Sequence, residues 1–508
     1  MSDFTSEAKN KIFYKMYVHN VSNRLREMET PTDIDCQRWP WELMQNAKDS
    51  ISGSNRNSIN IILKIEENSV TFQHDGNPFT SDTYYALLYK YSEGKANNSE
   101  STGRFGTGFL TTHSLSKIVN ISGPIFNEKN KIIGFEFTMY RDGKTNEELI
   151  DGLFRTDKEK KFYENKSPKW TIFKYDLKTK RNQESKILGK ENFEKNVILT
   201  MVFNDKYNNI QLIDNNKELI YKKIQEKPLN NDILLKEYSI NNTTSNNIIK
   251  KSFLYSKISE ESKELTEHFD TKRILNLECA IEINPENKEI IINMNSPSLF
   301  CSLPLVGSEK HILPFILNSN DFEPSTERQE ILLNGVEITK DEKKNNKMII
   351  SEVGINRYIL KRSFELFDKI VSFCSNNKFN NLHLLTKGLK DIKKINKYFD
   401  EKWYEDNYIK EMRKIIYKYP IIYDLKNNLS FIKNIYIPIY SNYNNEFTKL
   451  YYEIVKELFE YIPRYQESIN WSKYIWENGL ENNLIDIYKC INKYNNSNYN
   501  NNFKNKFI

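Results

Sequence analysis

Three polar side chains occur at helical spacing in the stretch RWPWELMQNAKDSI, residues 38–51. Glu42, Asn46 and Asp49 follow one another at steps of four and three residues, so a helix would present them along one face. A carboxylate in such a row can orient or deprotonate a water molecule, and an amide oxygen suits a hard cation. The spacing therefore predicts a helix face that takes part in chemistry.

Three further stretches follow this helix in a fixed order. HDGNPF (74–79) comes after a predicted strand, GRFGTGF (103–109) lies between a long polar loop and a predicted helix, and WTIFKYDL (170–177) begins a later strand. Each stretch is a weak signal alone, because glycine strings are common in loops. Their combination, in this order and at these intervals, is hard to produce by chance.

Taken together, these stretches resemble the ATP-binding domain of the GHKL superfamily, which includes gyrase, ninety-kilodalton heat-shock chaperones, histidine kinases and MutL. In that family an E-x-x-x-N-x-x-D helix precedes a D-x-G-x-G motif, a flexible lid, a G-x-x-G-x-G motif and a threonine on a late strand. The wording QHDGNPF, SEGK and TGRFGTGFLTTHSLS is most similar to heat-shock-chaperone-like and sacsin-like members. The resemblance covers residues 1–205 and implies that they bind ATP with Mg²⁺.

The resemblance implies a role for each polar residue of the opening helix. Glu42 would orient or deprotonate the water that attacks the γ-phosphate, Asn46 would bind Mg²⁺, and Asp49 would lie nearer the nucleoside. A basic residue from the following region often reaches the γ-phosphate in these ATPases. Arg328 in STERQEI resembles that residue, and Lys310 is a weaker candidate because an acidic neighbour offsets its charge.

The adenine contact is open between two neighbouring residues. Asp75 is the favoured candidate, because an ionised carboxylate only accepts hydrogen bonds and the adenine amino group donates one. A strict alignment on Gly76 instead puts His74 where the family's acid belongs, and Pro78 where its second glycine belongs. A neutral His74 can also accept a hydrogen bond. Thr171 would support the adenine site through its hydroxyl.

The remaining nucleotide contacts are expected in the two glycine-containing motifs and in the presumed lid between them. They are Gly76, Asn77, Ser92, Lys95, Gly103, Arg104, Phe105, Gly106, Thr107, Gly108 and Phe109. The glycines would let consecutive N–H groups converge on the phosphates, and the helix that begins near Phe109 would add its positive end. The two lid residues, Ser92 and Lys95, would touch phosphate when the lid closes.

The chain has 508 residues, too many for one core, so we expect several domains of the α+β class. Residues 1–205 would form the GHKL ATP-binding domain, a Bergerat-type α/β sandwich. Residues 206–340 have the pattern of an α/β region similar to the transducer domain of these ATPases. Residues 341–508 have a mostly helical pattern that ends in a low-complexity tail.

The composition of the chain restricts the kinds of partner and the cellular compartment that we expect for it. The chain has 74 basic and 68 acidic residues, and this near balance gives no strong argument for a nucleic-acid partner. The 5 cysteines are scattered without a C-x-x-C pair, which favours a reduced setting over a zinc site or a disulfide framework. No signal-peptide core or membrane-spanning run is present in the sequence. We expect a cytoplasmic protein that does not associate with membranes.

The resemblance implies an ATPase of slow turnover that uses lid closure and ATP-dependent homodimerisation to drive a conformational change. A chaperone-like or sacsin-like role is the favoured form, with a client that the sequence does not identify. The alternative is a DNA-linked clamp of the MutL, topoisomerase or MORC type, against which stands the absence of a concentrated basic stripe. A histidine kinase is disfavoured, because no helical phosphoacceptor histidine precedes the ATP domain. A nucleotide sensor that does not hydrolyse ATP is a further alternative.

Overall fold

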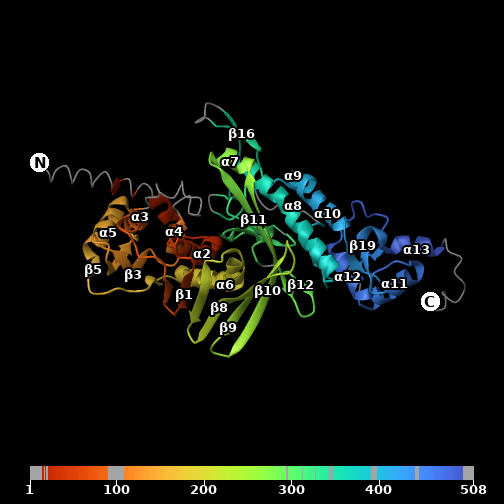
Figure 1. Cartoon of the computed structure of the whole chain (residues 1–508), viewed down its shortest axis with the longest axis horizontal. Coiled ribbons are helices and arrows are strands. Elements are labelled where there is room, and N and C mark those ends of the chain that lie inside the picture. The colour runs from red at the N-terminus through yellow and green to blue at the C-terminus, as the bar shows by residue number, and fades with distance from the viewer. Residues whose placement is uncertain are drawn as a thin grey trace. The chain divides into compact units, whose positions relative to one another are not determined.

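Figure 1 shows the computed structural model of the chain. The structure describes residues 14–15, 18, 21–89, 108–292, 296–311, 313–325, 328–341, 347–390, 397–440 and 445–495. The chain forms two compact units, each discontinuous in sequence. Unit 1 comprises Met1–Glu226, Lys236–Lys251 and Phe300–Gly307, and unit 2 comprises Lys227–Leu235, Ser252–Leu299 and Ser308–Ile508.

Unit 1 is built on a mixed sheet in the strand order β9-β8-β7-β1-β2-β6-β3-β4-β5. The strands are β1 (Ile59–Ile65), β2 (Ser69–His74), β3 (Ile118–Phe126), β4 (Ile132–Tyr140), β5 (Lys161–Tyr163), β6 (Thr171–Asp176), β7 (Tyr207–Asp214), β8 (Lys217–Pro228) and β9 (Leu234–Asn242). β1 pairs with β7 in parallel and with β2 antiparallel. Together with the helices, this sheet confirms the α+β class.

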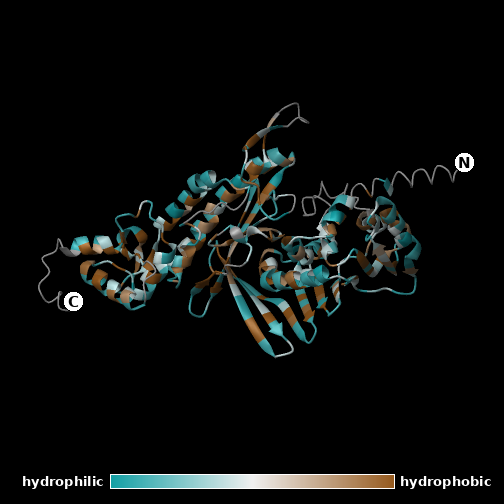
Figure 2. Ribbon diagram, turned by 180° about the vertical axis from the view of Figure 1, so that it is seen from behind, coloured by the Kyte–Doolittle hydropathy of each residue, from teal (hydrophilic) through white to brown (hydrophobic). Residues whose placement is uncertain are grey.

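The strands form because apolar and polar residues alternate along them. In β1, INIILKI, every second side chain from the first is buried. Figure 2 shows this kind of alternation as brown and teal bands along the strands. The alternating pattern of residues 58–76 predicts two strands joined by a tight turn at Glu67 and Asn68, and the structure confirms both strands, with the turn at residues 66–68.

The helices of unit 1 include the one that carries the polar row. They are α2 (Asp33–Asp49), α3 (Ser81–Tyr89), α4 (Gly108–Thr111), the 3₁₀ turn η1 (Thr112–Ser114), α5 (Asn146–Glu159) and α6 (Lys180–Phe203). α2 begins with a capping box in which the Thr32 and Asp35 side chains each accept a backbone N–H. The helix expected near Phe109 is only one turn long, so it brings little of the dipole expected from a longer helix.

Two tryptophans fix α2 against α6. The indole N–H of Trp39 donates to the carbonyl oxygen of Ser185 at 3.0 Å, and that of Trp41 donates to Oδ1 of Asn192 at 2.8 Å. Gly189 makes room for the first of these rings, since a Cβ at that position would lie 2.0 Å from Nε1 of Trp39. The two tryptophan hydrogen bonds and the close contact at Gly189 fix how α2 is rotated and positioned against α6.

Unit 1 extends beyond the boundary expected at residue 205. β7 belongs to it because this strand pairs with β1 over the whole of the latter's length. The segment Phe300–Gly307 also belongs to it, although unit 2 surrounds this segment in sequence. The Lys48 ammonium of α2 donates to Oγ of Ser302 at 2.9 Å, and Asn204 donates to the Ser302 carbonyl. Because these contacts join residues far apart in sequence, no local sequence pattern indicates where unit 1 ends.

Unit 2 begins with a smaller antiparallel arrangement in which β11 (Arg273–Asn284) pairs with β10 (Asn247–Ser262), β12 (Glu289–Ile291) and β15 (Ile316–Ser319). The long helix α8 (Glu352–Asn376) packs against β11. Other elements of this part are α7 (Lys263–Phe269), η2 (Ser308–Lys310), β16 (Ile338–Asp341) and β17 (Lys347–Ile350). β14 (Leu303–Pro304) belongs to unit 1, as does β13 (Leu299–Cys301) except for its first residue.

The rest of unit 2 is mostly helical. It contains η4 (Leu382–Thr386), α9 (Glu401–Trp403), η5 (Tyr404–Ile409), α10 (Lys410–Tyr417), β18 (Pro420–Tyr423), β19 (Leu429–Phe431), η6 (Ile432–Asn434), β20 (Ile437–Pro438), α11 (Asn445–Leu458), α12 (Tyr465–Tyr474), β21 (Leu484–Ile485) and α13 (Ile487–Asn495). We expected residues 341–508 to form a separate domain, but they fall in the same unit as β11. Across the described residues, the helices are too short or too polar to cross a bilayer.

Candidate functional site

The predicted row of polar residues lies on α2. Glu42 is 7% exposed, whereas Asn46 and Asp49 are half-buried. The Asn46 amide forms no hydrogen bond with any described residue. None of those residues therefore prevents its oxygen from binding a ligand. The row therefore places a buried carboxylate and an accessible amide one turn apart.

Glu42 is held by an arginine that the sequence analysis did not single out. Nη2 of Arg38 donates to Oε1 of Glu42 at 2.9 Å, and both side chains are buried. The two residues are four positions apart on α2, which is the spacing of helical ion pairs. That spacing was the available signal for Arg38. The ion pair fixes one carboxylate oxygen and directs the other away from α2.

The other carboxylate oxygen of Glu42 faces the end of the glycine motif. A Cβ placed on Gly108 would lie 2.0 Å from Oε2 of Glu42 and 2.9 Å from its Cδ. Only a glycine lets the backbone approach the carboxylate this closely. The structure thus brings together Glu42 and the last glycine of GRFGTGF, which are far apart in sequence.

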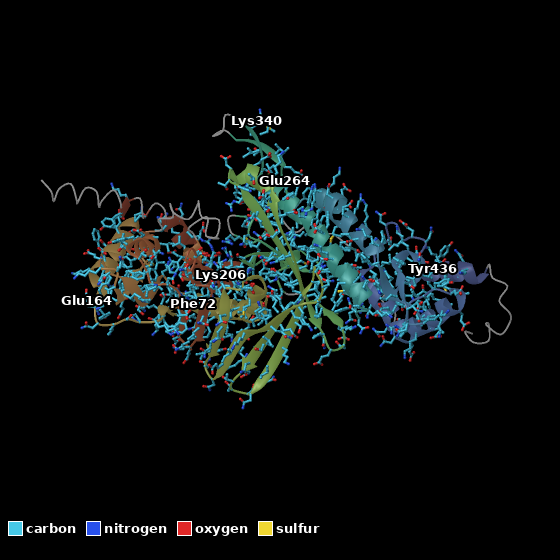
Figure 3. All side chains as sticks on the ribbon, viewed as in Figure 1. Phe72, Glu164, Lys206, Glu264, Lys340 and Tyr436 are labelled. Carbon is cyan, nitrogen blue, oxygen red and sulfur yellow. The ribbon has the colours of Figure 1, made fainter. Side chains whose placement is uncertain are left out.

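A second row of residues crosses the sheet on neighbouring strands. His74 ends β2 and is paired with Ile61 of β1 on one side and with Thr171 of β6 on the other. Phe72, labelled in Figure 3, and Phe173 form the next matching pair of β2 and β6. Residues two apart on a strand point to the same face, so these four side chains share one face of the sheet.

Thr171 has a buried hydroxyl without a hydrogen-bond partner among the described residues. Its side chain is 0% exposed. On the neighbouring strand, a Cβ at Gly123 would lie 3.0 Å from Oγ1 of Thr171, so the glycine lets β3 approach this residue closely. A buried polar atom without a partner is costly, and it points to a group that the protein binds.

His74 is neutral and has a defined tautomer. Burial lowers its pKa to about 4, so the ring carries no charge at pH 7. The Gly76 N–H donates to Nδ1 at 3.2 Å, which makes Nδ1 the acceptor and leaves the proton on Nε2. For Nε2 itself, the described residues provide no hydrogen-bond partner.

Asp75, the favoured adenine contact, has both carboxylate oxygens engaged. The Asn60 backbone N–H and Nη2 of Arg56 approach Oδ1 at 2.8 and 2.7 Å, and Nδ2 of Asn60 donates to Oδ2 at 2.8 Å. Burial opposes ionisation, but these partners outweigh it and hold the pKa of Asp75 below its usual value. The carboxylate fixes the loop after β2 to the start of β1, so Asp75 has a structural role in this loop.

Gly76 joins the two rows. A Cβ at this position would lie 1.9 Å from Oγ of Ser50, the residue that caps α2, and 2.8 Å from Nδ1 of His74. The loop after β2 therefore touches the carboxyl end of α2, while Gly108 approaches Glu42 two turns earlier on the same helix. Asn77, the next expected contact, is half-buried in the same loop.

Phe109 and the buried Arg141 make contacts that hold the segments before residue 90 and after residue 107. The Phe109 ring lies 5.9 Å from that of Phe173 and 5.7 Å from that of His113. Nη2 of Arg141 donates to the carbonyl oxygens of Leu87 and Leu88 at 3.1 and 3.0 Å. These contacts anchor α4 to β6, and α3 to the residue that follows β4.

Arg141 also fixes the tautomer of His113. Its Nη1 lies 3.1 Å from Nε2 of His113, and a guanidinium only donates, so Nε2 accepts and Nδ1 donates to the Ser116 carbonyl at 3.0 Å. Burial and the Arg141 cation lower the pKa of His113 to about 3. Sequence reasoning did not single out Arg141, because a lone arginine at the end of a strand carries no recognisable pattern.

Several predicted contacts lie outside the described residues: Ser92, Lys95, Gly103, Arg104, Phe105, Gly106 and Thr107. Arg328 belongs to unit 2, whereas the two rows belong to unit 1. It lies in a tight turn with a φ of 52°, and its N–H donates to the Ser325 carbonyl at 2.7 Å. Lys310 is also in unit 2, at the end of η2.

A comparison with models of protein families and with curated proteins found no match to this chain. The function must therefore be inferred from the two rows. Within the described residues, no group of three or more His, Cys, Asp or Glu side chains forms a metal site. The amide oxygen of Asn46 is a ligand type that suits a hard cation.

Proposed function

We propose that unit 1 binds a purine nucleoside triphosphate with Mg²⁺ and hydrolyses its terminal phosphate, as the resemblance to GHKL ATPases implies for ATP. The observation that carries this proposal is the pair of glycine contacts along α2. Gly76 approaches the helix at Ser50, and Gly108 approaches it at Glu42. The eight residues between these points correspond to a rise of about 12 Å, which suits an extended nucleoside triphosphate.

The base would lie at the Gly76 end. Here His74 and Thr171 present a ring N–H and a hydroxyl that the described residues leave without partners. Phe72 and Phe173 extend the same face with apolar rings, which suit a planar base.

The terminal phosphate would lie at the Gly108 end. Glu42 would orient the attacking water and accept its proton, because Oε2 faces away from the Arg38 ion pair. Asn46, one turn further along α2, would supply an oxygen ligand to Mg²⁺. When bound, Mg²⁺ would neutralise charge on the phosphates and on the group that leaves. Arg328 is the proposed source of an additional cation at that phosphate.

The same proposal includes an architecture, an oligomeric state and a conformational cycle, all of which depend on the resemblance to GHKL ATPases. It comprises a Bergerat-type architecture for residues 1–205, a transducer role for residues 206–340 and ATP-dependent homodimerisation. It also comprises a chaperone-like or sacsin-like conformational cycle. Sedimentation with and without a non-hydrolysable nucleotide tests the dimer. Binding of DNA with a steep salt dependence would instead favour a clamp of the MutL, topoisomerase or MORC type.

Phosphate release by the full chain tests the proposed reaction. An equimolar mixture of ATP and GTP with Mg²⁺ makes the result independent of which purine is preferred. We expect slow release by the wild type and a decrease of about 100-fold or more for Glu42→Gln, with binding retained. Glu147→Gln, a change of an exposed acid on α5, is the matched control and should leave release unchanged. Equal rates for all three proteins would contradict the proposal.

A further inference from the structure

A short hairpin of unit 2 carries Arg328, the residue proposed to bring a cation to the terminal phosphate. Its two arms come together at an antiparallel bridge between Pro324 and Ile331, and the Ser325 N–H donates to the Glu330 carbonyl oxygen at 2.7 Å. The Arg328 N–H donates to the Ser325 carbonyl oxygen, also at 2.7 Å, and closes the turn. Arg328 is therefore presented by two paired arms.

The backbone of Arg328 has a conformation that an arginine rarely adopts. Its φ of 52° lies in the left-handed region, which few residues other than glycine, asparagine and aspartate enter. Residues in this region persist where neighbouring contacts fix them, and they concentrate at functional sites. Here the Gln329 N–H donates to Oγ of Ser325 at 3.3 Å and adds to the bond between Arg328 and the Ser325 carbonyl. The turn thus fixes the direction in which the Arg328 side chain leaves the backbone.

Both arms of this hairpin are bound to one buried amide of α8. Oδ1 of Asn356 accepts the Glu323 N–H at 2.8 Å, and Nδ2 donates to the carbonyl oxygens of Glu323 and Leu332 at 2.7 and 3.0 Å. The Asn356 side chain is 0% exposed, so water does not take the place of a bond that is lost. A carboxamide suits this position because it offers an acceptor and two donors together, and here all three are engaged with the hairpin.

We propose that Asn356 is a positioning residue for Arg328, because its amide fixes the hairpin to α8 and so sets where the guanidinium meets the terminal phosphate. This inference rests on the proposed function, in which Arg328 supplies a cation to that phosphate. Stabilisation of the charge that develops in the transition state depends steeply on the distance and direction of the cation. A loosened hairpin therefore slows phosphate release far more than it weakens nucleotide binding.

A double-mutant cycle of phosphate release by the full chain, with ATP, GTP and Mg²⁺ present, tests this role. We expect Arg328→Ala to slow release about 100-fold or more and Asn356→Ala to slow it about tenfold. Nucleotide affinity should change less than about threefold in Asn356→Ala. The double variant should be no slower than Arg328→Ala alone, because Asn356 acts through the arginine. Losses that multiply in the double variant would show a general effect on the fold and overturn the proposal.

Asn318→Ala is the matched control and should keep wild-type release, because it removes another buried amide of unit 2 that donates to Glu278 and not to the hairpin. If Asn356→Ala does not fold, Asn356→Ser serves in the same cycle, since a hydroxyl can keep one of the hydrogen bonds. Wild-type release by Arg328→Ala would overturn the inference while leaving nucleotide hydrolysis by unit 1 intact. Absence of release by the wild type would overturn the proposed function as well.

Discussion

Glu42 and Gly108 approach each other so closely that a Cβ on residue 108 would lie 2.0 Å from Oε2 of Glu42. The contact joins the middle of α2 to the first residue of α4, and it exists only because residue 108 has no side chain. Together with the Arg38 ion pair at Oε1, it leaves the carboxylate little freedom. Fixed geometry of this kind is what a catalytic base needs, because small displacements reduce rates strongly.

Gly108→Ala should therefore act through Glu42. The added methyl group would displace the carboxylate, and we expect phosphate release to fall about 100-fold with little loss of nucleotide affinity. Glu42→Ala removes the atoms that the methyl group would meet. The double variant Gly108→Ala/Glu42→Ala should consequently be no slower than Glu42→Ala alone. Single-turnover phosphate release measures the rate of the two single variants and of the double variant. If the rate losses of the single variants multiply in the double variant, the two residues act separately.

Asn46→Ala should weaken nucleotide binding only when Mg²⁺ is present. In the proposed site the amide would supply one oxygen to the cation, and it forms no hydrogen bond with any described residue. We expect the Mg²⁺ concentration for half-maximal binding to rise about tenfold. Titration of Mg²⁺ at fixed nucleotide measures this change, and titration in excess chelator is the control. An equal loss of affinity with and without Mg²⁺ would place Asn46 on the nucleotide and not on the cation.

Much of unit 1 follows from short-range patterns in the sequence. The row Glu42, Asn46 and Asp49 is predictable because a helix repeats every 3.6 residues, and β1 and β2 are predictable because their buried residues alternate. The ion pair of Arg38 with Glu42 has a local signal too, since the two residues are four positions apart. These features need no knowledge of how distant segments pack.

The features that sequence reasoning missed all depend on distant contacts. Asp75 looked free to bind adenine, but its partners Asn60 and Arg56 come from the other side of a hairpin. The unit boundary lies beyond residue 205 because β7 returns to pair with β1. Ser302 accepts a hydrogen bond from Lys48 of α2, although the two residues are 254 positions apart in sequence. No spacing rule relates such residues, so only the fold brings them together.

Asp75→Asn should destabilise unit 1. The carboxylate accepts hydrogen bonds from Asn60 and Arg56, and the loss of a charged acceptor costs about 1.5–3 kcal/mol. The folded pKa of Asp75 is lowered, so its contribution is present above the unfolded value of 3.8 and is lost as the pH falls through the folded value. Wild type and variant should thus differ at pH 7 and converge below pH 4. Denaturant unfolding at the two pH values measures this convergence, and a constant difference would contradict the assigned partners.

His113 should make unit 1 less stable as the pH falls from 6.5 toward 3. Burial and the Arg141 cation lower its folded pKa to about 3, whereas the ordinary value is 6.5, so between these values the unfolded chain binds the additional proton. Stability is therefore complete above pH 6.5 and declines below it by up to about 1.4 kcal/mol per pH unit. His113→Gln can keep an acceptor toward Arg141 without titrating, and it should reduce this slope. His74, whose pKa burial lowers to about 4, contributes the remaining slope in the same direction. Amide exchange in β1 and β2 between pH 7.5 and 5 reports the stability of unit 1.

His268 in unit 2 should respond in the opposite direction and provides the control. Burial opposes its protonation, but hydrogen bonds to Glu323 and to the Ile350 carbonyl outweigh burial and raise its pKa above 6.5. The contribution of His268 to stability is thus present below pH 6.5 and is lost as the pH rises through the folded value. His268→Gln should lower the stability of unit 2 more at pH 5.5 than at pH 8, as measured by amide exchange in β10 and β11. Parallel pH responses of the two histidine variants would contradict the contacts assigned to both rings.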